Sequence, residues 1–232
     1  MPLREPEANR QPQVRWIRVW DLPIRLFHWT IVILVLASYV TARTGHIEWH
    51  FRSGYAILAL VLFRIGWGIA GSDTARFSGF VRGPRAALRH LREVLHPAPE
   101  RLSHVAGHNP AGAYMVVALL GLLLFQAVTG LFANDGLMVE GPLAIYAGGA
   151  LSDRLTKWHG LGFDVIVIAV GIHVLAILAY AVLVRTNLVR PMITGWSRLP
   201  ASISQPAIAP LWRAAALLGA AAALVWGIAS HG

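Results

Sequence analysis

The chain has 232 residues, of which 56% are hydrophobic and only 13% are charged. This composition excludes an ordinary soluble domain and is typical of a bundle of membrane-spanning helices. The formal net charge is +9, but the basic residues lie between long apolar runs, which argues against a nucleic-acid partner. The chain has no cysteine, which excludes disulfides, thiolate metal sites and covalently attached haem.

Five apolar runs are each long enough to cross the ~30 Å hydrocarbon core of a membrane as a helix. We expect membrane spans at residues 26–42, 50–70, 110–133, 158–184 and 212–230. Between the second and third spans, the stretch 82–95 has apolar and basic residues at helical spacing, typical of an amphipathic surface helix or of a solvated connector. The sequence therefore predicts an all-α integral membrane protein, a four-helix bundle with a fifth, C-terminal transmembrane helix.

The basic residues are unevenly distributed between the two sides of these spans. Of the twenty, five precede or open the first span, six lie between the second and third, and four lie between the fourth and fifth or open the fifth. Loops on the cytoplasmic side carry the excess of Lys and Arg. We therefore expect a cytoplasmic N-terminus and, for five spans, an external C-terminus. The first fifteen residues are polar, so we expect the first span to act as its own insertion signal.

Ten histidines are many for this length, and a histidine within the membrane is either paired or costly. Six are expected to be solvated or interfacial, because they fall in loops, in the tail or just before the third span: His46, His90, His96, His104, His108 and His231. The remaining four lie within or at the mouth of the first, second and fourth spans: His28, His50, His159 and His173. Position therefore selects these four as candidate functional residues.

His159 and His173 are fourteen residues apart on one predicted helix. That spacing is ~21 Å along the axis and within ~40° of one face, so the two side chains belong to sites at two depths. Each needs a partner from another helix. With the orientation above, depth pairs His50 with His159 on the outer side and His28 with His173 on the inner side.

Facing imidazoles in a chain without cysteine suit bis-histidine ligation of haem iron, because neutral imidazole is a good iron ligand. The same four histidines are also compatible with structural hydrogen bonds between helices. A zinc site at His46-Ile-Glu-Trp-His50 is a weaker alternative, since the glutamate is not where the H-E-x-x-H pattern needs it. The spacing alone leaves these alternatives open.

Stretches from three of the predicted helices resemble the bacterial cytochrome b561 and nickel-iron hydrogenase b-type cytochrome family. Residues 19–29, Val-Trp-Asp-Leu-Pro-Ile-Arg-Leu-Phe-His-Trp, resemble its first helix. Gly107-His108-Asn109-Pro110 and the run 126–132, Gln-Ala-Val-Thr-Gly-Leu-Phe, resemble its third helix, and Lys157-Trp158-His159 with His173 matches its fourth. The likeness covers about residues 15–195, so the fifth span departs from the family's four-helix core.

The resemblance implies two b haems, ligated by one histidine from each of the first two helices and two from the fourth: His28, His50, His159 and His173. It also implies electron exchange, in the bacterial inner membrane, between quinone and a periplasmic redox partner such as a c-type cytochrome or hydrogenase. Some members instead oxidise superoxide and reduce quinone, which is an enzyme activity. A haem-free anchor or transporter subunit is the alternative from another class.

Cations near a haem edge stabilise its anionic propionates. Arg52 and Lys157 flank the outer pair, and Arg64 lies toward the inner end of the second span. Each is a candidate propionate contact or a side chain that reaches the membrane surface. Asp164, five residues after His159, is a candidate to hydrogen-bond a ligand imidazole, relay a proton or pair with a cation.

The organisation expected from these features has three parts. Residues 1–15 form a cytoplasmic tail, residues 16–195 a dihaem cytochrome b domain, and residues 196–232 a connector followed by the C-terminal transmembrane helix.

Overall fold

The computed structural model describes residues 14–95, 106–134, 136 and 139–230. Within them, five helices are long and apolar enough to cross a membrane: α1 (Leu22–Arg43), α2 (Ile47–Ala70), α5 (Pro110–Leu131), α7 (Gly149–Leu183) and α9 (Leu211–Ala229). The prediction of an all-α membrane protein with five spans is confirmed. The expected tail, apart from its last two residues, and His96, His104 and His231 lie outside the described residues.

The helix ends follow from local capping. The Asp21 side chain accepts a hydrogen bond of 2.8 Å from the Ile24 amide, and α1 therefore begins four residues before the predicted span. The Asn109 side chain caps α5 in the same way, accepting 2.7 Å from the Gly112 amide, with Pro110 in the first turn. Helix α7 begins at Gly149, well before the predicted span, because its polar first turns continue the helix outside the apolar run. Its 35 residues span ~52 Å and exceed the ~30 Å hydrocarbon core.

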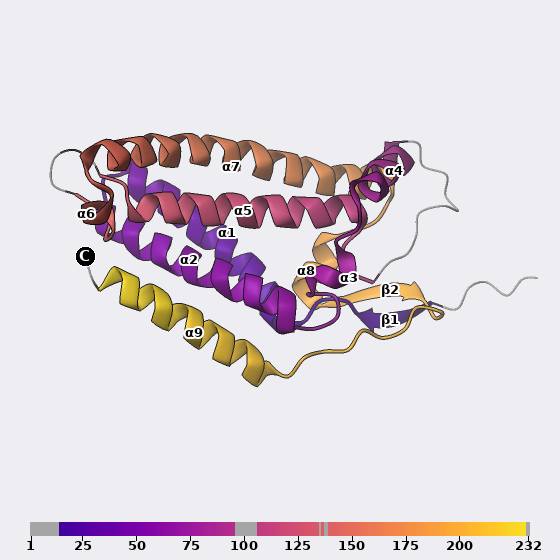
Figure 1. Ribbon diagram of the computed structural model, residues 1–232. Coiled ribbons are helices and arrows are strands. Elements are labelled where there is room, and N and C mark those ends of the chain that lie inside the picture. Colours follow the sequence, from indigo (N-terminus) through magenta and orange to yellow (C-terminus); the bar gives the residue numbers. More distant parts are fainter. Residues whose placement is uncertain (1–13, 96–105, 135, 137–138, 231–232) are drawn as a thin grey trace, which may run out of the picture.

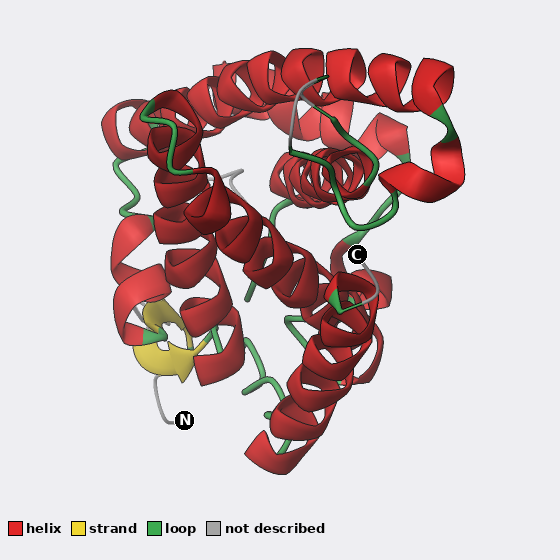
Figure 2. Cartoon of the chain, turned by 90° about the vertical axis from the view of Figure 1, so that its left-hand side faces the viewer, coloured by secondary structure: helices red, strands yellow, loops and turns green. Residues whose placement is uncertain are grey.

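Helix α2 lies at the centre of the bundle and packs against α1, α5 and α9 (Figure 1). Helix α7 packs on α5 and contacts α1 through Phe163, whose ring stacks on Tyr39 at 5.1 Å. Helix α9 lies on the side of α2 away from α7. Figure 2 views the bundle from the end that carries α6 (Ala144–Ala147), here called the α6 end.

A two-stranded antiparallel ribbon occupies the opposite end of the bundle, here called the ribbon end. It pairs β1 (Val14–Arg18) with β2 (Trp196–Pro200). Gly195 follows the short helix α8 (Val189–Thr194) with φ +87°, and its carbonyl accepts the amides of Val19 and Trp20 at 2.8 and 3.1 Å. A Cβ at Gly195 would lie 2.8 Å from the Trp20 carbonyl oxygen, so the turn requires glycine. The sequence analysis did not predict this ribbon.

Two further helices join α2 to α5: α3 (Phe77–Phe80) and α4 (Pro84–Leu95). The amphipathic stretch 82–95 is therefore helical from Pro84 onward, and α4 packs on α5. The core of the bundle is densest near the ribbon end, where Ile17, Val61 and Trp67 are fully buried.

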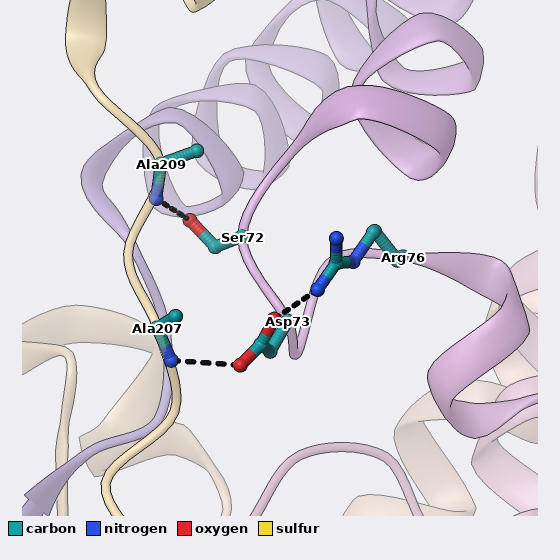
Figure 3. A network of polar contacts seen from close by, with 5 residues as sticks. All are labelled: Ser72, Asp73, Arg76, Ala207 and Ala209. Atoms are coloured by element: carbon teal, nitrogen blue, oxygen red, sulfur yellow. Dashed lines mark hydrogen bonds and ion pairs between the residues drawn. The ribbon is translucent and has the colours of Figure 1, made fainter.

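The segment before α9 is fastened to the turn that follows α2 (Figure 3). Asp73 accepts the Ala207 amide at 2.8 Å and pairs with Arg76, while the buried Ser72 hydroxyl accepts the Ala209 amide at 2.9 Å. These bonds fix the start of α9 beside the end of α2, and the fifth helix is therefore an integral part of the bundle.

Candidate functional site

The structure brings His50 and His159 together near the α6 end, from the first turn of α2 and from α7. Their ring centroids are 6.0 Å apart and their planes are nearly perpendicular, at 89°. The two side chains thus face one another across two helices that are more than a hundred residues apart in the sequence.

Hydrogen bonds fix the protonation of both rings. The Nδ1 atom of His50 lies 2.9 Å from the Ser38 carbonyl oxygen, and that of His159 lies 2.9 Å from the Gln126 carbonyl oxygen. A carbonyl only accepts, so each Nδ1 carries the hydrogen and each Nε2 carries a lone pair that can accept a hydrogen bond or bind a metal. The Gln126 side-chain amide lies 3.2 Å from His159 Nε2, where its nitrogen donates to that lone pair. Both rings are therefore oriented as neutral Nε2 ligands.

One face of α5 is shaped to receive the His159 ring. A Cβ added at Gly130 would lie 2.9 Å from His159 Cε1, a distance too short for normal packing. Thr129, one residue earlier, places its hydroxyl 3.4 Å from His159 Nδ1. Sequence reasoning gave Ser38, Gln126, Thr129 and Gly130 no role, although the last three fall in the stretch that carried the family resemblance.

His28 on α1 and His173 on α7 form a second pair, near enough for their charges to interact. The His28 ring packs edge-on against Trp29 at 4.9 Å. Its Nδ1 atom is shielded from solvent, and among the described residues no hydrogen-bond partner reaches it. Because His159 and His173 are ~21 Å apart along α7, the two pairs lie at different depths in the bundle.

The three candidate cations have different surroundings. Arg52 is exposed, pairs with Glu48 at 2.5 Å and lies over the Trp49 ring at 5.0 Å. Lys157 is also exposed, two residues before His159. Arg64 has only 2% of its surface exposed, so its side chain is enclosed by the protein. The structure places Arg52 and Lys157 at the same end as His50 and His159, and among the described residues neither cation forms a hydrogen bond or cation–π contact with either ring.

Arg64 is the charged residue most deeply enclosed within the spans that the structure describes. It donates to the Ala75 carbonyl at 3.3 Å and lies 5.0 Å from the centroid of the Phe77 ring. The nearest carboxylate, Asp21, already accepts the Ile24 amide and, at 2.9 Å, the Trp67 indole N–H. The positive charge of Arg64 is therefore incompletely paired in a region of low dielectric, which favours an additional anion there.

Two histidines that were expected to be solvated or interfacial are packed inside the protein. His90 is only 5% exposed and is hydrogen-bonded to the Tyr180 hydroxyl, which joins α4 to α7. His108 packs between Trp20 and Phe80, with ring centroids 4.5 and 4.4 Å away. Burial, reinforced by the nearby Arg64 charge, lowers the pKa of His108 to about 3, so this ring is neutral near pH 7. Loop packing, which local sequence does not encode, explains both differences.

Asp164 does not hydrogen-bond a histidine of either pair. It is exposed on α7, and five residues of helix turn it ~140° away from His159. Among the described residues, no group of three His, Cys, Asp or Glu side chains converges as a metal site would require. The candidate chemistry therefore rests on pairs of imidazoles.

The two pairs fit haem b. The chain has no cysteine for covalent attachment. Both rings of the first pair carry an Nε2 lone pair, and the second pair includes a shielded ring nitrogen that no described residue hydrogen-bonds. These features suit neutral imidazoles that would bind haem iron.

Comparison with known proteins gives the family. The family model of prokaryotic cytochrome b561 matches residues 19–195. A protein named probable Ni/Fe-hydrogenase B-type cytochrome subunit from Azotobacter chroococcum mcd 1 is 26% identical over 212 residues, covering 78% of this chain and 88% of its own length. A protein of the same name from Rhodobacter capsulatus is 28% identical over 213 residues, covering 77% and 80%. No solved structure matches the chain. The match over residues 19–195, with the five apolar helices, shows that the chain belongs to the prokaryotic cytochrome b561 family and is a multi-pass membrane b-type cytochrome, a haem protein of electron transport.

Proposed function

We propose that the chain binds two haem b groups, one between His50 and His159 and one between His28 and His173, and conducts electrons along the bundle. The observation that carries this proposal is the geometry of the first pair, where both Nδ1 atoms bond to backbone carbonyls and both Nε2 atoms carry a lone pair that could bind iron, the one on His159 after the Gln126 side-chain amide moves aside. A structural histidine that only joins helices has no need of a fixed, outward-facing lone pair.

The protein's part in this function is to hold and orient the ligands. When bound, haem b supplies one-electron chemistry through its iron. Ser38 and Gln126 fix the tautomers of their histidine partners through backbone carbonyls, and Gly130 leaves room for the His159 ring. Because both ligands on α7 share one face ~21 Å apart, the helix defines a path along the membrane normal.

Arg64 is the best candidate to contact an inner haem propionate. Its charge is enclosed and incompletely paired, and an arriving carboxylate would complete that pairing. Arg52 and Lys157 are candidates for the propionates of the other haem. Since both are exposed, solvent screens their charges and each contributes less than Arg64.

The chain exchanges electrons, in this proposal, between membrane quinone and a redox partner on the α6 side. The concentration of Arg on the opposite side supports a cytoplasmic N-terminus in a bacterial inner membrane. The names of the relatives favour a Ni/Fe hydrogenase as partner over a c-type cytochrome. Residues 16–195 form the haem domain, and the connector at 196–210 leads to α9, which packs on α2.

The first test is a count of haem. The chain purified in mild detergent should give a reduced-minus-oxidised b-type spectrum, and a pyridine haemochrome assay should give two haem b per chain. A single haem per chain would contradict the paired assignment. A colourless protein, after expression with sufficient haem, would contradict haem binding and favour an anchor or transporter role.

The partner and the quinone are tested in membranes. Hydrogen should reduce the chain's haem in membranes of a host that contains the hydrogenase, and deletion of that hydrogenase should abolish the reduction. A quinol analogue should reduce the purified chain without any other protein. Failure of quinol and of hydrogen, with two haems present, would reject these partners while leaving the dihaem assignment intact.

A further inference from the structure

The carboxylate of Asp164 lies on the outer surface of α7, facing away from the bundle. The buried positions of this part of α7 are Gly162, which abuts Gln126 and Phe125 on α5, and Ile166, which is 3% exposed. Asp164 is two residues from each and therefore points ~160° away from both, and ~180° away from His173. It is exposed, and no side chain in the described ranges forms a hydrogen bond or ion pair with it.

This carboxylate is at hydrocarbon depth. Asp164 is seven residues beyond Lys157, or ~10 Å along the helix, and no other charged residue occurs on α7 after it. The neighbouring Phe163 stacks on Tyr39, which lies one turn inside Arg43 on α1. Position along α1 and position along α7 therefore both place Asp164 inside the charged ends of the spans. A charged side chain that faces lipid at such a depth is costly and is normally paired.

The residues around Asp164 form an open surface for another helix. Gly160, Ile168, Gly171 and Leu175 share its face at three- and four-residue spacing, and Ile168 and Leu175 are 63% and 65% exposed. A Cβ at Gly160 or Gly171 would meet nothing within 4 Å. Small residues at such positions let two helix backbones approach closely in a membrane. We call these five residues the Asp164 face.

We propose that the Asp164 face binds a transmembrane helix of a different polypeptide, which carries a Lys or Arg at the depth of Asp164. Charge complementarity selects this occupant over a second copy. Within the described spans of this chain, the one basic residue placed deep between the ends is Arg64, and it is enclosed in α2. Packing α7 of one copy against α7 of a parallel copy would instead bring two Asp164 carboxylates together. This inference does not depend on haem binding.

The test is site-specific photo-crosslinking in the native host, with the chain expressed from its own promoter. A photoreactive amino acid replaces Ile168 on the Asp164 face, and a matched control replaces Ile33 on α1, which is 65% exposed. We expect a discrete adduct from position 168 and not from position 33. Mass spectrometry of the adduct should identify an apolar helix that contains Lys or Arg.

The adduct should depend on the carboxylate. D164L should lower its yield about fivefold or more, the factor that corresponds to ~1 kcal/mol for a polar contact between helices in lipid, and D164E should retain it. Exchanging the charges, with D164K and Asp in place of the partner's basic residue, should restore it. If D164L does not accumulate in membranes, D164N replaces it with the same expected direction.

Several outcomes would overturn the proposal. These are an adduct that is insensitive to D164L and D164N, an adduct between two differently tagged copies of this chain, adducts with lipid alone, or a partner helix without a basic residue. Haem content of the variants, measured in parallel, separates this inference from the proposed function, because loss of the adduct with full haem content affects only the partner helix.

Discussion

The protein fixes the orientation of its two imidazole pairs to different degrees. At the α6 end, both Nδ1 atoms are held by helix carbonyls and Gly130 leaves space for the His159 ring. At the other pair, the Nδ1 atom of His28 has no hydrogen-bond partner among the described residues. The comparison teaches that the fold alone orients one imidazole pair, whereas the other, in the proposed dihaem arrangement, depends more on a bound cofactor for orientation.

The largest expected effect comes from removing a ligand of either pair. His159→Ala should lose the haem at the α6 end and His173→Ala the other, each lowering the haem content from two to one per chain. In the proposed arrangement each haem would be held by the two imidazoles of its pair, so removing one of them would leave that haem weakly bound. The pyridine haemochrome assay measures the content, and redox titration should show one remaining component that differs between the two variants. Full haem content in either variant would reject the pairing.

The second prediction tests whether the space at Gly130 is needed to position the His159 ring of the α6-end pair. Gly130→Ala adds a Cβ 2.9 Å from His159 Cε1, and such overpacking typically costs about 1–3 kcal/mol. We expect haem affinity at this pair to fall about tenfold, with the other pair unaffected. Haem retention during detergent washes measures the effect. The matched control is Gly121→Ala, also on α5, where a Cβ meets nothing within 4 Å; equal losses in both variants would disprove the steric explanation.

The third prediction concerns His108, a histidine that belongs to neither pair. Its pKa falls from 6.5 to about 3 on folding. Below pH 6.5 the unfolded chain binds a proton at this ring and the folded chain does not, so stability decreases as the pH falls from about 6.5 toward 3. The loss is ~1.4 kcal/mol per pH unit. His108→Gln should therefore unfold less readily on acidification than the parent, as measured by thermal denaturation at pH 7.5 and 5.5. An unchanged difference between the two pH values would reject the burial of a neutral ring.

The smallest expected effect separates enclosed from exposed cations. Arg64→Leu should lower the midpoint potential of one haem on the order of 50 mV, because a positive charge in low dielectric stabilises the reduced haem. Arg52→Gln serves as the control, since its side chain is 60% exposed and screened by solvent. Potentiometric titration of both variants provides the measurement. Equal shifts, or a larger shift in Arg52→Gln, would remove Arg64 from the candidate propionate contacts.

The spans were predictable because each depends on a local property, a long apolar run. The depth sorting of the four histidines was equally accessible, since helical rise converts sequence spacing into distance. The early start of α7 was missed because the spans were predicted from apolar runs. Residues Gly149 to Lys157 are helical but too polar to belong to such a run. The ribbon was missed because β1 pairs with a strand about 180 residues away, and such non-local pairing leaves no local signal.

Much of the site's detail depends on tertiary packing. The carbonyl of Ser38 reaches His50 only because α1 and α2 pack together, and the space at Gly130 matters only because α7 crosses α5 there. The burial of His108 likewise needs Trp20 and Phe80 from two distant segments. Residue type and position in the spans singled out four histidines as candidates, but the groups that orient His50 and His159 could be identified only in the folded chain.

The ribbon has a consequence for the order of events during synthesis. Val14 pairs with Pro200 and Arg18 with Trp196, so β1 waits for its partner while about 180 further residues are translated. At ~5–20 residues per second, that delay is roughly 10 to 40 s. During this interval the apolar Ile17, which is fully buried in the finished protein, has no strand beside it. The ribbon therefore cannot close until α7 and α8 have been made, and a nascent chain halted before residue 196 leaves this end of the protein unfinished.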